Sequence, residues 1–252
     1  MLGSGSSGNC TFLATDRVKI LIDAGLSCKA TLDRLRKIEE DPESLDAILV
    51  THEHSDHIGG LARLANRYKI PVYLTAPTRD ALPPQTELPA CETIRAGGCF
   101  QIADLTVEPF TVPHDAADPV AFRLTAEGVR IAVATDLGYL PENVKYYLRS
   151  CHCLILEANH DLEMLRAGPY PWYLKQRIMS KDGHLSNMAV MEFLKTNSDG
   201  QTQLVVLVHL SQQNNHPEIA RLAAASALGS HDTRETKLAV SSQRQPTEVF
   251  CF

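Results

Sequence analysis

A dense group of potential metal ligands stands out in this sequence. The run Thr51-His52-Glu53-His54-Ser55-Asp56-His57 places three imidazoles and an aspartate within six residues. Imidazole nitrogens suit zinc and iron, and a carboxylate extends the choice to manganese. On a tight loop, His52 and His54 can converge on one ion while Asp56 and His57 point toward a neighbouring position. The alternative interpretation, a polar surface loop, does not account for so many ligands in one run.

Further polar residues follow apolar runs that have the character of β-strands. His114 follows Thr111-Val112-Pro113, Asp136 follows residues 131–135, and His209 follows residues 204–208. Taken alone, each of them is an ordinary turn residue. Together with the histidine cluster they predict a metal site that is built from several loops.

Short β-rich runs alternate with helical segments along the chain. Expected strands are 11–15, 18–22, 46–50, 71–74, 106–109, 120–125, 129–134, 154–157, 204–208 and 237–242, and expected helices are 28–40, 59–68, 187–194 and 217–228. The first two strands should form a hairpin. Strands followed by helices, twice over, favour two packed sheets with helices outside.

Composition narrows the class of protein. The 252 residues are 44% hydrophobic and 21% charged, which is an ordinary globular balance and predicts a single domain over residues 1–252. The net charge of -6 argues against a protein that coats nucleic acid through a global positive field. Seven scattered cysteines without a C-x-x-C motif indicate reduced thiols. The N-terminus lacks signal-peptide features and no apolar run reaches membrane-spanning length, so we expect a cytoplasmic protein with no membrane partner.

The order His-x-His-x-Asp-His, then a lone His, an Asp and a last His resembles the metallo-β-lactamase superfamily. The resemblance covers nearly the whole chain and implies an α/β fold, a four-layer αββα sandwich. It implies that one metal is held by His52, His54 and His114, and the other by Asp56, His57 and His209, with Asp136 between them. Asp23, in Leu21-Ile22-Asp23-Ala24-Gly25, is similar to the family's first motif, a carboxylate that supports a ligand from behind.

The resemblance also implies a reaction. Two divalent ions (Zn, Mn or Fe) would be the cofactors, and a hydroxide bridging them would be the nucleophile of a hydrolase. Asp56 would orient this nucleophile. Since the superfamily hydrolyses lactams, thioesters, lactones and phosphodiesters, the fold alone does not name the substrate.

Finer likenesses favour a nuclease. Several segments resemble the YycJ (WalJ) group, which is associated with 5′-to-3′ exonuclease activity on DNA; they begin at Gly3, His114, Leu156, Gly183 and His209. Glu157-Ala158 followed by a histidine in a His-Leu-Ser setting also resembles the tRNA 3′-processing nucleases. By that resemblance His184 would be the general acid and Glu157 the residue that orients it. The alternative is that His184 caps a helix beginning near Ser186.

Two other segments have open interpretations. The opening Gly3–Asn9 is either a flexible loop or a backbone nest for an anionic group. The stretch Arg166–Lys181 contains four basic and three aromatic side chains, including the only tryptophan, and no Asp or Glu. It is either a single-strand-binding segment or an aromatic packing cluster under a solvated basic face. The sequence assigns no role to His152, His160, His216, His231, Asn214 or Asn215.

The leading hypothesis is therefore a metal-dependent phosphodiesterase, a DNA exonuclease with nucleic acid as its partner. The alternative is a small-molecule hydrolase acting on a thioester, a lactone or a cyclic phosphodiester. A di-iron redox domain is disfavoured because that subgroup usually carries a carboxylate where this chain has His54. A metal-free binding module is disfavoured by the complete ligand set.

Overall fold

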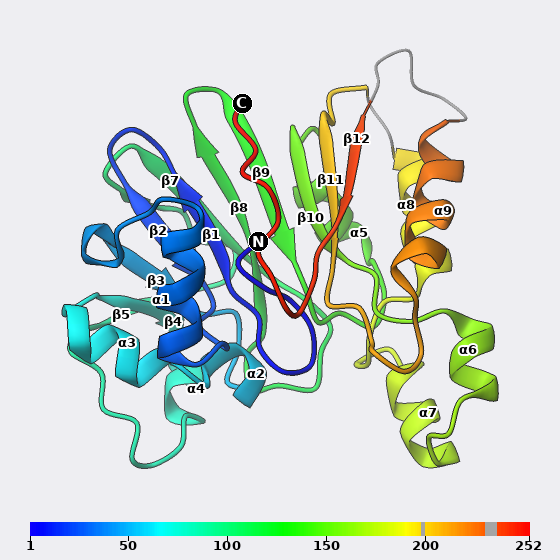
Figure 1. The fold of residues 1–252 in the computed structure, drawn as a ribbon, viewed down its shortest axis with the longest axis horizontal. Helices are drawn as coiled ribbons and strands as arrows, with labels where there is room; N and C mark the ends of the chain where they lie inside the picture. Colours follow the sequence, from blue (N-terminus) through cyan, green and yellow to red (C-terminus); the bar gives the residue numbers. More distant parts are fainter. Residues whose placement is uncertain (198–199, 230–235) are drawn as a thin grey trace. The chain divides into compact units, whose positions relative to one another are not determined.

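The computed structural model describes residues 1–197, 200–229 and 236–252, so His231 lies outside the described residues. The chain forms two compact units. Unit 1 contains residues 1–111, 116–120 and 242–252, and unit 2 contains residues 112–115 and 121–241. Figure 1 shows their elements. That residues 1–252 make one domain stays a prediction, because compactness does not show whether a unit folds alone.

Unit 1 is built on a mixed five-stranded sheet. Its order is β1 (Thr11–Ala14), β2 (Lys19–Ile22), β3 (Ala47–Leu49), β4 (Val72–Thr75) and β5 (Cys91–Ile94). The first two strands form the expected antiparallel hairpin, and β2 to β5 run parallel. The strands β6 (Phe100–Ile102) and β7 (Leu105–Thr111) pair antiparallel.

The helices of unit 1 are α1 (Cys28–Lys37), α2 (Ser55–Ile58), α3 (Leu61–Tyr68) and α4 (Ala76–Asp80), with a 3₁₀ turn at Pro42–Ser44. The two longest, α1 and α3, each bury an apolar face. Leu32 and Leu35 of α1 and Leu61 and Leu64 of α3 lie in one buried cluster with residues of the sheet, as their helical spacing predicts. Helix α1 begins after Ser27, whose side chain accepts a hydrogen bond from the Ala30 amide.

Unit 2 contains a second mixed sheet. Its strands lie in the order β12 (Lys237–Val240), β11 (Leu204–Val208), β10 (Cys153–Glu157), β9 (Val129–Ala134) and β8 (Val120–Ala126). The strands β9 to β12 run parallel, and β8 pairs antiparallel with β9. Every residue of β10 and β11 is buried, as expected for parallel strands that are covered on both faces.

Five helices accompany this sheet: α5 (Glu142–Leu148), α6 (Leu162–Ala167), α7 (Trp172–Ile178), α8 (Asn187–Asn197) and α9 (Pro217–Leu228). Helix α9 packs against α8 and β12 (Figure 1), and Lys175 of α7 donates a hydrogen bond to the Arg166 carbonyl of α6. Among the described residues, no helix combines the length and the apolarity that crossing a bilayer requires.

The parallel strands explain where the polar residues of unit 2 come together. Strand β9 ends just before Thr135 and Asp136, β10 ends at Glu157, and β11 ends just before His209. Leu156 is in register with Ala134, and Glu157 with Val208. Carboxyl ends of parallel strands share one edge of a sheet, so these side chains are delivered to the same place.

All fourteen expected strands and helices are present, with ends shifted by up to three residues. The sequence interpretation missed short elements, namely α2, α4, α5, α6, α7, β5 and β6. These elements are three to seven residues long, which is too short to display a clear hydrophobic period.

Candidate active site

In unit 1, the carboxylate of Asp23 organises the histidine cluster from below. Its Oδ2 lies 2.7 Å from His57 Nδ1 and 2.9 Å from the Thr51 hydroxyl, and its Oδ1 accepts the Thr51 amide at 2.8 Å. The Thr51 Oγ1 also lies 2.9 Å from His52 Nδ1. The Asp23 carboxylate only accepts hydrogen bonds, so the Nδ1 of His57 carries a proton. The Thr51 hydroxyl donates its one proton to Asp23 and therefore accepts from the Nδ1 of His52. In both rings Nε2 is then the nitrogen with a lone pair for a metal.

The sequence predicted a tight loop over residues 51–57. The structure differs in the second half of this run, which forms the helical turn α2. His52 and His54 precede α2, and their Nε2 and Nδ1 atoms lie 3.1 Å apart. Asp56 and His57 lie on α2, with Asp56 Oδ2 3.5 Å from His57 Nε2. The structure thus brings together the two ligand pairs within unit 1 that the sequence predicted.

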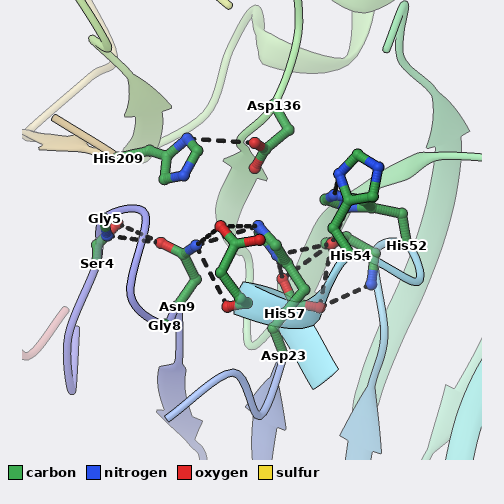
Figure 2. Close-up of polar contacts among 12 residues, drawn as sticks. Ser4, Gly5, Gly8, Asn9, Asp23, His52, His54, His57, Asp136 and His209 are labelled. Atoms are coloured by element: carbon green, nitrogen blue, oxygen red, sulfur yellow. Dashed lines mark hydrogen bonds and ion pairs between the residues drawn. The ribbon is translucent and has the colours of Figure 1, made fainter. Parts of the chain in front are cut away.

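Asn9 is a member of this cluster that sequence reasoning missed. Its Nδ2 lies 3.2 Å from Asp56 Oδ2 and 3.1 Å from His57 Nε2, while its Oδ1 accepts hydrogen bonds from Ser4 Oγ and the Gly5 amide (Figure 2). These acceptor contacts fix the orientation of the amide. The NH₂ group is therefore directed at the two candidate ligands. Only the position of Asn9 after a Gly/Ser-rich loop hinted at this.

The loop before Asn9 uses several of its amides within the protein. The Gly5 amide donates to Asn9 Oδ1, the Ser7 amide to Gln243 Oε1, and the Gly8 amide to the Gly5 carbonyl. Because these N–H groups are committed within the protein, the nest prediction is wrong. The loop instead supports Asn9.

In unit 2, Glu157 is the centre of a second cluster. Its side chain is fully buried, and Oε1 lies 2.8 Å from both His184 Nδ1 and His209 Nδ1. Its Oε2 accepts the amides of Leu137 and Leu185, both at 3.0 Å. Four donors for one carboxylate fix both rings, with Nδ1 protonated and Nε2 on the opposite side of each ring.

Asp136 and His114 complete this cluster. Asp136 Oδ1 lies 3.2 Å from His209 Nδ1 (Figure 2) and 3.9 Å from His114 Nε2. The Nδ1 of His114 lies 3.2 Å from the Gly183 carbonyl, which can only accept. Burial lowers the pKa of His114 despite the nearby Asp136 carboxylate, so this imidazole is neutral at pH 7, as a metal ligand must be.

Electrostatics separate the roles of Glu157 and His184. Burial alone would raise the pKa of Glu157, but the hydrogen-bonded His184 overcomes it and holds this pKa well below its usual range. For His184, burial lowers the pKa and the Glu157 carboxylate more than compensates, so the net shift is upward. The Glu157 carboxylate therefore favours the doubly protonated form of His184. The helix-cap alternative is wrong, because the amide of Ala189 bonds to the Ser186 hydroxyl at the start of α8.

The stretch Arg166–Lys181 covers the end of α6 and all of α7. Trp172 and Tyr173 are exposed, so the packing-cluster alternative is wrong for these two rings. Lys175, in contrast, is buried and donates to the Arg166 carbonyl.

Two asparagines to which the sequence assigned no role, Asn214 and Asn215, hold the loop after β11 through hydrogen bonds. Asn215 exchanges hydrogen bonds with Asn187 and donates to the Ala158 carbonyl, which ties the loop after β11 to α8 and β10. Asn214 bonds through its backbone to Asp161 and Ser211. His160 is buried, and its Nδ1 has no hydrogen-bond partner within the described part of the chain.

Comparison with known proteins agrees with this arrangement. Residues 18–210 match the family described as beta-lactamase superfamily domain. The chain is 38% identical over 231 residues to "Exodeoxyribonuclease YycJ" of Bacillus anthracis, covering 90% of this chain and 88% of that protein. It is also 38% identical over 237 residues to "Exodeoxyribonuclease WalJ" of Streptococcus pneumoniae, covering 92% of this chain and 88% of the relative.

The fold is shared with solved structures. The metallo-beta-lactamase fold protein YhfI of Bacillus subtilis superposes with a TM-score of 0.73 at 18% identity, over 96% of this chain and 94% of YhfI. The predicted fold class is thereby confirmed as an α/β fold with two mixed sheets. Clustered buried histidines and carboxylates, a family match over most of the chain and a shared fold lead to one conclusion: this chain belongs to the metallo-β-lactamase superfamily of hydrolases.

Proposed function

We propose that this chain is a metal-dependent phosphodiesterase that removes nucleotides from the ends of DNA. The observation that carries the proposal is the pair formed by Glu157 and His184, 2.8 Å apart at the edge of the second sheet and adjacent to Asp136 and His209. The names of two relatives, both exodeoxyribonucleases at 38% identity over about nine-tenths of this chain, support DNA as the substrate.

The donor set fits divalent cations. Four of the proposed histidine ligands have a hydrogen-bond partner at Nδ1 and present Nε2 on the other side of the ring; they are His52, His57, His114 and His209. This is the arrangement that a supporting hydrogen bond creates in metal-binding histidines. The proposed ligands, carried over from the order of the family's motifs, are His52, His54, Asp56, His57, His114, Asp136 and His209. When bound, two such ions (Zn, Mn or Fe) supply a nucleophile from water near neutral pH and neutralise negative charge on a phosphodiester.

His184 would protonate the leaving group. A deoxyribose alkoxide is a poor leaving group, so cleavage benefits from a proton delivered as the P–O bond breaks. With Nδ1–H donating to Glu157, a proton on Nε2 of His184 is the one that can be transferred. The carboxylate of Glu157 stabilises the charged imidazolium before that transfer and keeps the ring in one orientation.

Asp56 acts on the side of the attacking water. Its carboxylate is held by the Nδ2 of Asn9 at 3.2 Å, so one oxygen is fixed by the protein. We assign to Asp56 the task of accepting a hydrogen bond from the water that attacks phosphorus. A carboxylate that is already positioned avoids the entropic cost of ordering it during the reaction.

The test combines two substrates that differ in the need for an acid. End-labelled single- and double-stranded DNA carry an alkoxide leaving group, whereas bis(p-nitrophenyl) phosphate carries a stable phenolate. We expect manganese- or zinc-dependent loss of nucleotides from one DNA end, and no cleavage by Asp56→Ala. His184→Gln should slow DNA cleavage by about 10²–10⁴-fold and leave hydrolysis of the activated ester nearly unchanged.

A matched control is His152→Gln, since His152 is half-buried in unit 2 and its Nδ1 accepts a hydrogen bond from the backbone amide of Arg130. This variant should retain both activities. The opposite outcome is a wild-type protein that leaves DNA intact and rapidly hydrolyses a thioester, a lactone or a cyclic phosphodiester. That result would contradict the nuclease proposal and support the small-molecule hydrolase. If His184→Gln loses the same fraction of its activity on DNA and on bis(p-nitrophenyl) phosphate, His184 is not the general acid.

A further inference from the structure

Helix α7 presents two aromatic side chains to solvent at its start. Trp172 is 62% exposed and Tyr173 is 73% exposed. Large exposed apolar groups that lie next to each other commonly mark a binding surface, because leaving them in water gains nothing for folding. We call this pair the aromatic platform.

Helix α7 connects the aromatic platform to the proposed acid, His184. Helix α7 ends at Ile178, and the amide of His184 donates to the Ile178 carbonyl at 2.9 Å. A Cβ added to Gly183 would lie 2.2 Å from the same carbonyl oxygen, so only glycine allows this close return of the chain. Seven helical residues span about 10 Å, which corresponds to about three stacked nucleotides.

The charges around the platform suit phosphate groups. The net charge of the chain is -6, yet residues 166–181 contain no acidic side chain and four basic ones, of which Lys175 is buried and donates to the Arg166 carbonyl. Arg166 pairs with Glu163 and Arg177 with Asp115, and both arginines are more than half exposed. Exposed ion pairs of this kind contribute little, so an approaching phosphate can take the place of the carboxylate.

We propose that Trp172 and Tyr173 stack on unpaired bases of a single DNA strand whose end is bound at His184. This proposal rests on the proposed function and adds to it the preferred form of the substrate, a single-stranded or frayed end. Flat aromatic faces recognise bases without regard to sequence, and the neighbouring arginines contact the backbone. The platform is a positioning device, so its loss should raise KM for long strands and leave kcat and the hydrolysis of bis(p-nitrophenyl) phosphate unchanged.

The single tryptophan offers a direct readout. Titration of the full-length protein with the oligonucleotide (dT)8 should quench Trp172 fluorescence to saturation, whereas the mononucleotide dTMP should not. By anisotropy of labelled (dT)8, Trp172→Leu and Tyr173→Leu should each weaken binding about tenfold, the change expected for one lost base stack. Trp172→Phe retains an aromatic face and should lose less. Leucine keeps an apolar side chain, so this series separates stacking from general hydrophobic contact.

The matched control is Tyr146→Leu, because Tyr146 is also 62% exposed in unit 2 but lies on α5. It should bind (dT)8 like the wild type. If wild-type protein cleaves DNA but Trp172→Leu and Tyr173→Leu bind and cleave it normally, the platform is overturned and the nuclease stands. If (dT)8 quenches Trp172 but no DNA is cleaved, the platform stands and the proposed function fails.

Discussion

Three residues of the candidate site share an uncommon backbone conformation. Asp23, Asp136 and His209 have φ values of 60°, 58° and 56°. Each lies just after a strand, where the chain turns away from the sheet. Left-handed conformations cost residues other than glycine roughly 1–2 kcal/mol, so the surrounding contacts must impose them. Such conformations concentrate at functional sites because they aim a side chain in a direction that regular structure does not offer.

Asp23→Asn tests the supporting role of that carboxylate. An amide in place of Oδ2 would either lose the hydrogen bond from His57 Nδ1 or present a donor to it, which disturbs the tautomer that leaves Nε2 for a metal. We expect zinc affinity to fall about 10–100-fold, measured by competition with a chelator. The exposed Asp16→Asn is the control and should keep wild-type affinity; equal affinity in both variants would contradict the role of Asp23.

His160 predicts a pH dependence of stability. Burial, the largest influence, lowers the pKa of His160 to about 4, against an ordinary value of 6.5. Between these values the unfolded chain binds a proton that the folded chain does not. Stability therefore falls as the pH drops from 6.5 toward 4.

The variant His160→Leu should remove that contribution. In metal-free protein, the wild type should lose up to roughly 3 kcal/mol more than the variant between pH 7 and pH 4. Urea denaturation at several pH values measures this difference. Parallel curves for the two proteins would show that His160 titrates normally in the folded state.

At the scale of elements, the turn after β2 and the helical turn α2 approach each other at Gly25. A Cβ on Gly25 would lie 1.6 Å from the Asp56 carbonyl oxygen. The same carbonyl accepts the Asn9 amide at 2.7 Å, and the Gly25 amide donates to the Asn9 carbonyl. The placement of Asp56 and His57 thus depends on backbone contacts among three separate segments.

Gly25→Ala should consequently be among the most disruptive small substitutions in unit 1. The methyl group cannot be accommodated without moving α2, which should cost at least about 2 kcal/mol of unfolding free energy and lower metal affinity as well. Gly229→Ala is the matched control, because its nearest neighbour would be 3.4 Å from the new Cβ. Thermal unfolding and zinc titration of the two variants provide the comparison; an unaltered Gly25→Ala protein would contradict this packing argument.

At the scale of the whole molecule, the proposed ligands are spread along the chain from His52 to His209. A metal that binds such a set only in the folded protein must stabilise it through mass action. The proposed ligands come from several loops, so the stability of the metal-bound protein depends on the correct placement of all of these loops.

Metal addition should therefore raise the unfolding temperature. With free zinc or manganese at 100 times its Kd, the gain is about 2.7 kcal/mol, which corresponds to roughly 5–10 °C for a chain of this size. EDTA should reverse the shift, and Asp136→Ala should abolish most of it. Calorimetry that finds the same shift in wild type and Asp136→Ala would exclude Asp136 from the ligand set.

The sequence by itself determined the periodic elements and the grouping of His52, His54, Asp56 and His57. Strands and longer helices repeat their apolar residues along the chain, and a compact ligand run needs no knowledge of distant contacts. His114, Asp136 and His209 follow apolar strands, and only their order after the histidine cluster makes them candidate ligands. Local patterns and the order of motifs along the chain were sufficient for these predictions.

Only the tertiary structure decided which partners these residues have. The contacts of Glu157 with His184 and His209 join residues 27 and 52 positions apart, and they depend on the parallel alignment of β10 and β11. The role of Asn9 depends on α2, 47 positions further along. Exposure of Trp172 and burial of Lys175 were likewise undetermined, because a seven-residue helix does not reveal which face will be covered. Such properties arise from packing between segments, which no local pattern encodes.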